Sequence, residues 1–90
     1  MERYFFHIED GETLQDEQGL ELRNIEAARQ EAVAVMAQYL RDRPDDIWNE
    51  RPVTVTVQDD QGMTLFCVIT SGHNAAAVGG KRVADRPGGA

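Results

Sequence analysis

Few side chains in this sequence could do acid–base or nucleophilic chemistry, and none has a recognisable companion. His7 is the only histidine among the first 70 residues, and an imidazole titrates near neutral pH, so it could serve as an acid, base or metal ligand. Such roles need a second group nearby, whereas His73 lies in another part of the chain. We therefore expect no enzyme activity, no cofactor and no metal, with a small-molecule site around His7 as the alternative.

Cys67 is the only cysteine, which excludes an internal disulfide and a cysteine-rich zinc site. It alternates with Leu65 and Ile69 along an apolar run. This spacing predicts a buried thiol that acts as a small apolar side chain and not as a reactive nucleophile.

Acidic side chains gather in a repeat, because LQDEQGLEL at 14–22 returns as VQDDQGMTL at 57–65. Calcium loops need oxygen ligands at alternating positions and a distant bidentate Glu, and the carboxylates here lack that register. Asp at the first position and Gly at the fourth are typical of a type I turn followed by a bulge. The repeat therefore predicts two turns of the same chemistry, with solvated acidic groups at Asp16, Glu17, Asp59 and Asp60.

Three segments alternate with a period of two and so predict β-strands, at 3–8, 53–57 and 63–70. Between Asn24 and Arg43 the apolar residues instead recur every three or four positions, which predicts an amphipathic helix. Asn24 can cap the start of this helix, and Pro44 ends it.

Together these elements predict an α+β fold of order β-β-α-β-β, with one amphipathic helix packed on a small antiparallel sheet. Whether residues 12–15 and 20–22 form regular strands is left open. The side of the sheet that faces the helix is expected to carry Tyr4, Phe6, Ile8, Val53, Val55, Val57, Leu65, Cys67 and Ile69.

The opposite side of the sheet would then be unusually apolar for a surface exposed to water. An exposed apolar patch commonly marks a binding site, and a symmetric homodimer is the simplest partner for it. The alternative is that Trp48 folds over the patch within one chain. The expected contact residues are Phe5, His7, Phe66, Val68, Thr54 and Thr56.

Charge divides the chain into two parts near Thr70. Residues 1–70 hold 6 Lys and Arg against 15 Asp and Glu, a net charge of −9, and residues 71–90 hold 3 against 1, or +2, which together give −7. An acidic domain at 1–70 disfavours nucleic-acid binding, and residues 71–90 read as a flexible tail rich in Gly and Ala. With no long apolar segment and a single cysteine, we expect a cytoplasmic protein without membrane contact.

Five separated pieces carry a resemblance: RYFFH at 3–7, DG at 10–11, D-x-x-G-x-E-L at 16–22, E-A-A-R-x-E-A at 26–32 and V-x-V-x-D-x-x-G at 55–62. In this order they resemble a family of small uncharacterised bacterial domains, common in alphaproteobacteria, to which no reaction, cofactor or ligand is assigned. The resemblance covers residues 3 to about 69 and implies a stand-alone cytoplasmic protein.

Residues 4–40 are also similar to the start of HicB-type antitoxins, which block a small toxin. This second resemblance implies that the acidic surface could mask a basic partner protein.

Overall fold

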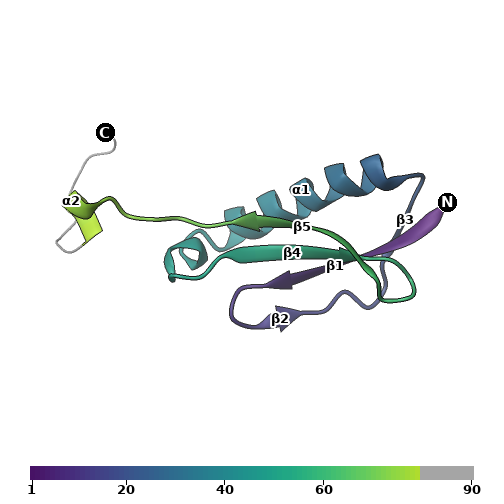
Figure 1. Cartoon of the computed structure of the whole chain (residues 1–90), viewed down its shortest axis with the longest axis horizontal. Coiled ribbons are helices and arrows are strands. Elements are labelled where there is room, and N and C mark those ends of the chain that lie inside the picture. The colour runs from purple at the N-terminus through teal and green to yellow at the C-terminus, as the bar shows by residue number, and fades with distance from the viewer. Residues whose placement is uncertain (80–90) are drawn as a thin grey trace.

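The computed structural model describes residues 1–79, in which one long helix lies along one face of an antiparallel sheet (Figure 1). The strands follow the order β2-β1-β4-β5, and β3 also pairs with β1. This arrangement confirms the predicted α+β fold with a single main helix. The elements are β1 (Glu2–Glu9), β2 (Thr13–Leu14), β3 (Leu20–Leu22), α1 (Ile25–Asp42), a 3-10 turn (Asp46–Trp48), β4 (Val53–Gln58), β5 (Thr64–Thr70) and a short α2 (Ala76–Gly79).

The short strands β2 and β3 together form one interrupted edge of the sheet. Both run antiparallel to β1, with Leu14 opposite Ile8 and Leu20 opposite Tyr4. The DEQG loop lies between them, so it interrupts an edge and does not reverse the chain. In contrast, DDQG joins β4 to β5 as a hairpin turn. The repeat therefore encodes the same local turn in two different topological positions.

Local chemistry sets both ends of α1 as expected. The side chain of Asn24 accepts a hydrogen bond from the backbone N–H of Ala27 at 2.9 Å, which satisfies a free donor in the first turn. Arg43 caps the other end through its backbone N–H, directly before Pro44. The buried residues of the helix are Ala28, Ala32, Met36 and Tyr39.

The core lies between α1 and the sheet. Val53, Val55 and Val57 of the central strand β4 are the largest side chains that are completely buried among the described residues. Tyr4 and Phe6 of β1 lie beside them, so the two central strands present the faces that the sequence predicted. From the helix, two small and completely buried residues, Ala28 and Ala32, join the core together with the larger Met36 and Tyr39.

The prediction that Leu65, Cys67 and Ile69 of β5 face the helix is wrong. Gln58 lies opposite Thr64 and Val57 lies opposite Phe66, so the register passes over Leu65. One extra residue in a strand turns every later side chain to the other face, because side chains alternate with a period of two. As a result Phe66 and Val68 pack against the core, whereas the exposed residues are Leu65, Cys67 and Ile69.

Two predictions for residues outside the strands are wrong: that Trp48 covers the sheet, and that no regular structure follows Thr70. Trp48 does not cover the sheet; its ring lies against Gly72, past the end of β5, and remains half exposed. Ala76–Gly79 forms the single helical turn α2, where no regular structure was predicted. The rest of the predicted tail, residues 80–90, lies outside the described residues.

We predict that Val55→Ala lowers the free energy of unfolding by about 2 kcal/mol, because it leaves a cavity between α1 and the sheet. Urea denaturation followed by circular dichroism measures this change. The matched control is Val33→Ala on the helix surface, where the side chain is 59% exposed and the loss should be near zero. Equal losses in the two variants would contradict the assigned core.

Candidate functional site

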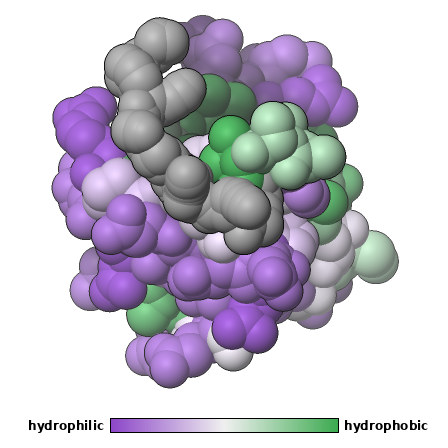
Figure 2. Space-filling view, turned by 90° about the vertical axis from the view of Figure 1, so that its left-hand side faces the viewer, coloured by the Kyte–Doolittle hydropathy of each residue, from purple (hydrophilic) through white to green (hydrophobic). Residues whose placement is uncertain are grey.

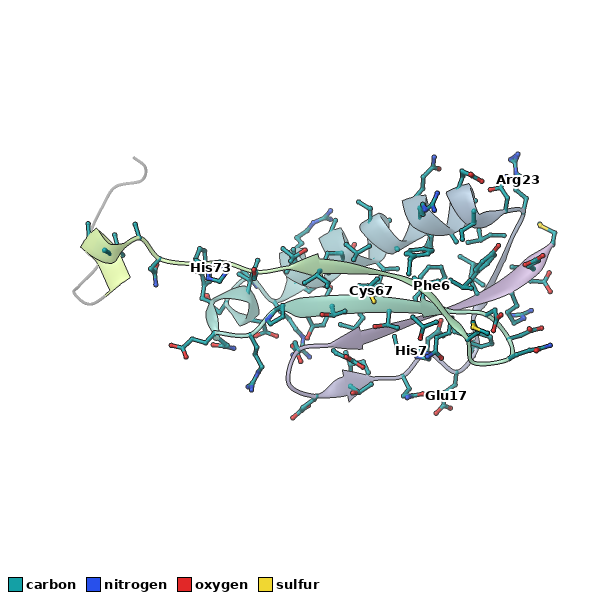
Figure 3. The ribbon with its side chains drawn as sticks, in the orientation of Figure 1. Phe6, His7, Glu17, Arg23, Cys67 and His73 are labelled. Carbon is teal, nitrogen blue, oxygen red and sulfur yellow. The ribbon has the colours of Figure 1, made fainter. Side chains whose placement is uncertain are left out.

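The outer face of the sheet, on the side away from α1, is the candidate site. Figure 3 shows Phe6 directed toward the helix and His7 directed away from it. Of the six predicted contact residues, Phe5, His7, Thr54 and Thr56 lie on this half-buried outer face. Phe66 and Val68 do not, and the exposed residues Leu65, Cys67 and Ile69 take their place.

A chain of hydrogen bonds crosses the outer face at His7. The backbone N–H of Asp16 donates to Nδ1 of His7 at 3.0 Å, and Nε2 of His7 lies 3.2 Å from Oε1 of Gln58. The amide nitrogen of Gln58 in turn donates to the hydroxyl of Thr64 at 3.2 Å. The chain thus connects the DEQG loop with β1, β4 and the start of β5.

These hydrogen bonds determine which nitrogen of the His7 imidazole carries the proton. A backbone N–H can only donate, so Nδ1 of His7 must be the acceptor and Nε2 carries the proton of the neutral ring. Both ring nitrogens of His7 are therefore engaged in hydrogen bonds within the sheet. In this structure His7 is a hydrogen-bonding residue of the sheet.

In the gap between β2 and β3, where β1 has no neighbouring strand on that side, the carboxylate of Asp16 accepts backbone hydrogen bonds. Its oxygens accept hydrogen bonds from the backbone N–H groups of Phe6 at 3.1 Å, Gln18 at 3.2 Å and Gly19 at 3.0 Å. Burial acts to raise the pKa of Asp16, but these three donors outweigh it and hold the pKa below the ordinary value of 3.8. The ionised carboxylate thereby stabilises the interrupted edge.

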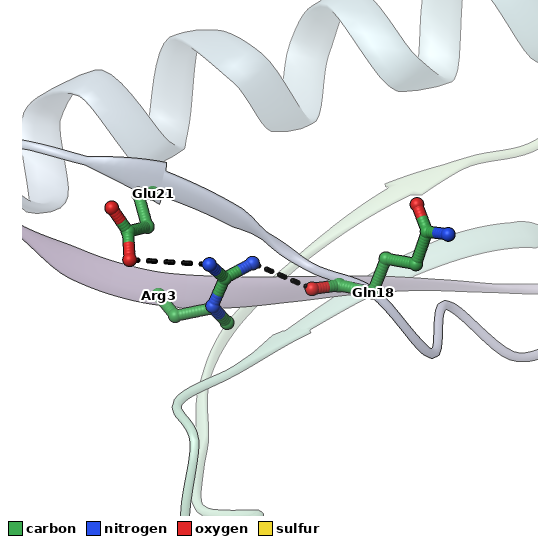
Figure 4. Close-up of polar contacts among 3 residues, drawn as sticks. All are labelled: Arg3, Gln18 and Glu21. Carbon is green, nitrogen blue, oxygen red and sulfur yellow. Dashed lines mark hydrogen bonds and ion pairs between the residues drawn. The ribbon is translucent and has the colours of Figure 1, made fainter.

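Arg3 of β1 makes two contacts along the β3 end of the same edge (Figure 4). Its guanidinium donates to the backbone oxygen of Gln18 at 2.7 Å and to the carboxylate of Glu21 at 3.1 Å. Both charged side chains remain well exposed, so the ion pair contributes little to stability. Its effect is to place charge along this edge of the sheet.

The two edges of the sheet differ sharply. The β2/β3 edge is made of short strands, broken by the DEQG loop and lined by charge, and these features normally prevent pairing with another chain. The β5 edge is seven residues long and contains no charged residue and no proline, and its one bulge, at Leu65, lies near its start. Within the described residues 1–79, β5 pairs only with β4, so its outer backbone groups have no partner strand there.

A second polar cluster ties the turn after β1 to the end of α1. The hydroxyl of Tyr39 donates to the carboxylate of Asp10 and lies 3.3 Å from Oδ2 of Asp46, and the guanidinium of Arg43 lies over the Tyr39 ring at 5.4 Å. The hydrogen bond from Tyr39 lowers the pKa of Asp10, while burial and the same bond raise the pKa of Tyr39. These groups satisfy one another and hold the turn in place.

The two largest hollows described for residues 1–79 are not lined by His7. A groove of about 460 Å³ runs between α1 and Ile8, and an acidic hollow of about 500 Å³ lies between Glu2 and the DDQG turn. Figure 2 views the end of the molecule that carries α2, where most of the visible described surface is hydrophilic.

Two further properties concern the described residues 1–79. No three or more His, Cys, Asp and Glu side chains among them are placed to hold a metal ion together. No helix in this part of the chain combines the length and apolar character needed to cross a bilayer.

A family model described as "Domain of unknown function (DUF6894)" matches residues 3–71. The chain belongs to this family. The match covers α1 and all five strands apart from Glu2, the first residue of β1. Among curated proteins and among solved structures, nothing matches this chain.

The outer residues of β5 were the ones that sequence reasoning placed wrongly. A clean alternation from Met63 to Thr70 gives no sign of the extra residue at Leu65. The turn motif accounts only for Gly62, because the backbone N–H of Asp59 bonds the Met63 oxygen and Gln58 still lies opposite Thr64. No local signal marks the extra residue at Leu65.

We predict that Asp16→Asn lowers the free energy of unfolding by about 2 kcal/mol at pH 7, since it weakens hydrogen bonds to a charged acceptor. Because the folded pKa is depressed, this contribution is present above pH 3.8 and is lost as the pH falls through the lower folded value. Urea denaturation at pH 7 and pH 3 measures it. In the control Glu17→Gln the exposed carboxylate makes no such bonds, and a loss equal to that of Asp16→Asn would contradict the role of Asp16.

We also predict that His7 is the Nε2–H tautomer at pH 8. Nitrogen-15 NMR of the imidazole distinguishes the two tautomers, with exposed His73 as an internal reference. A proton on Nδ1 of His7 would contradict the hydrogen-bond chain.

Proposed function

We propose that this DUF6894 protein is a non-enzymatic interaction domain that self-associates through the β5 side of its sheet. The single observation that carries the proposal is the outer edge of β5, which is seven residues long, uncharged and, within residues 1–79, not paired with any strand. Such an edge pairs readily with another strand, and proteins usually protect it by charge, proline or a break. The opposite edge of the same sheet has that protection.

Exposure of apolar side chains beside this edge supports the proposal. Ile69 is 65% exposed, and Leu65, Cys67 and Met63 are also exposed along the same hairpin. Contiguous apolar surface of this kind is characteristic of contact sites. Burying it against a second copy would also add to a core that is thin for a chain of this length.

The distribution of charge favours contact at β5 over contact elsewhere. Residues 1–70 carry a net charge of −9, so two copies repel each other over most of their surfaces. Thr64–Thr70 contains none of that charge. The β5 edge is therefore where two copies can approach with little repulsion.

We predict that light scattering at micromolar concentration gives a mass of twice the 10.0 kDa chain. Ile69→Asp should weaken the self-association more than about tenfold, because it places a charge in the contact. Ile69 suits this test because its side chain does not pack against the core.

Leu14→Asp is the matched control, since Leu14 lies on the opposite edge, is 47% exposed and should leave the mass unchanged. A wild-type chain that stays monomeric throughout the micromolar range would overturn the proposed function.

A further inference from the structure

We infer that the second copy joins by antiparallel pairing of β5 with β5 about a two-fold axis at Cys67, which makes one continuous sheet across both copies. This inference rests on the proposed self-association and specifies its geometry. Cys67 is the central residue of the strand, with three residues on either side.

The central five residues of β5, Leu65–Ile69, are nearly a palindrome by residue type, LFCVI. In a two-fold antiparallel pair centred on Cys67, each of these residues lies opposite its mirror position in the other copy. Leu65 then faces Ile69, and Phe66 faces Val68. Aliphatic and aromatic–β-branched pairs are favourable cross-strand combinations. A strand from an unrelated protein would have no reason to match this order, so the pattern favours a second copy of the chain.

The faces of the sheet agree with this pairing. Residues that lie directly opposite each other in an antiparallel pair point to the same face. Leu65 and Ile69 are both on the outer face, and Phe66 and Val68 are both on the face of α1. The two-fold axis is therefore perpendicular to the sheet, and both helices lie on the same side of it.

Pairing about Cys67 also places the acidic turn beside a segment without acidic residues. The turn at the start of β5 contains Asp59 and Asp60, and in the pair it lies beside the segment just after β5 in the other copy. That segment, Ser71–Ala75, has no acidic residue of its own and includes His73, while Glu50 and Arg51 both line the hollow next to it. The acidic turn thus meets a mixed surface and not a second acidic turn.

Cys67 offers a direct test without any substitution. Opposed residues of antiparallel strands have Cα atoms about 4.5–5.5 Å apart, which is within the range that a disulfide can bridge. Treating the protein with diamide, which takes up the two electrons and two protons lost by a pair of thiols, should give a covalent dimer in high yield on a non-reducing gel.

The control moves the thiol along the strand. In Cys67→Ser/Ile69→Cys the two thiols of a dimer would be four residues apart, about 13 Å along the strand, and should not be joined. Mixing this variant with Cys67→Ser/Leu65→Cys should restore the covalent dimer, because position 65 lies opposite position 69.

Equal yields for thiols at positions 67 and 69 in a protein that scatters as a dimer would overturn the pairing about Cys67 and leave the proposed self-association intact. A monomer by light scattering would overturn both.

Discussion

The structure depends on burial of the three valines of β4 between the sheet and α1. They are completely buried, and both neighbouring strands and the helix pack around them. Burying a valine contributes roughly 1.5–3 kcal/mol, a large share of what so small a domain can gain. With Val53, Val55 and Val57 turned inward, the faces of β1 and β5 follow from their pairing with β4.

That constraint explains the character of the outer face. Residues opposite the buried valines must also face inward, so Phe66 and Val68 are drawn under the helix, where the guanidinium of Arg29 lies 6.0 Å from the Phe66 ring. Leu65, Cys67 and Ile69 are left on the outer side. A strand that is apolar on both faces and unpaired on one edge is poorly suited to water, and this is the physical reason that β5 is the contact surface we propose.

The two copies of the QDxQG turn show how one local motif serves two purposes. In both, an Asp carboxylate accepts backbone N–H groups of its own turn, and the Gly adopts a positive φ, 72° at Gly19 and 82° at Gly62. At Asp59 the motif closes a hairpin. At Asp16 it fills a gap beside β1 and positions the imidazole of His7 through the Asp16 N–H. The same chemistry thus builds an open edge on one side of the sheet and a closed edge on the other.

The sequence by itself determined the features that depend on local patterns: the span of α1 and its Asn24 cap, the two turns, and the inward faces of β1 and β4. Periodicity and capping act over a few residues, so they can be read without knowing the partners of a strand. Only the tertiary structure decided which side of β5 is buried, because one unpaired residue at Leu65 reverses every later side chain. It also decided that Asp16 engages His7, since that contact joins segments whose pairing no local pattern specifies.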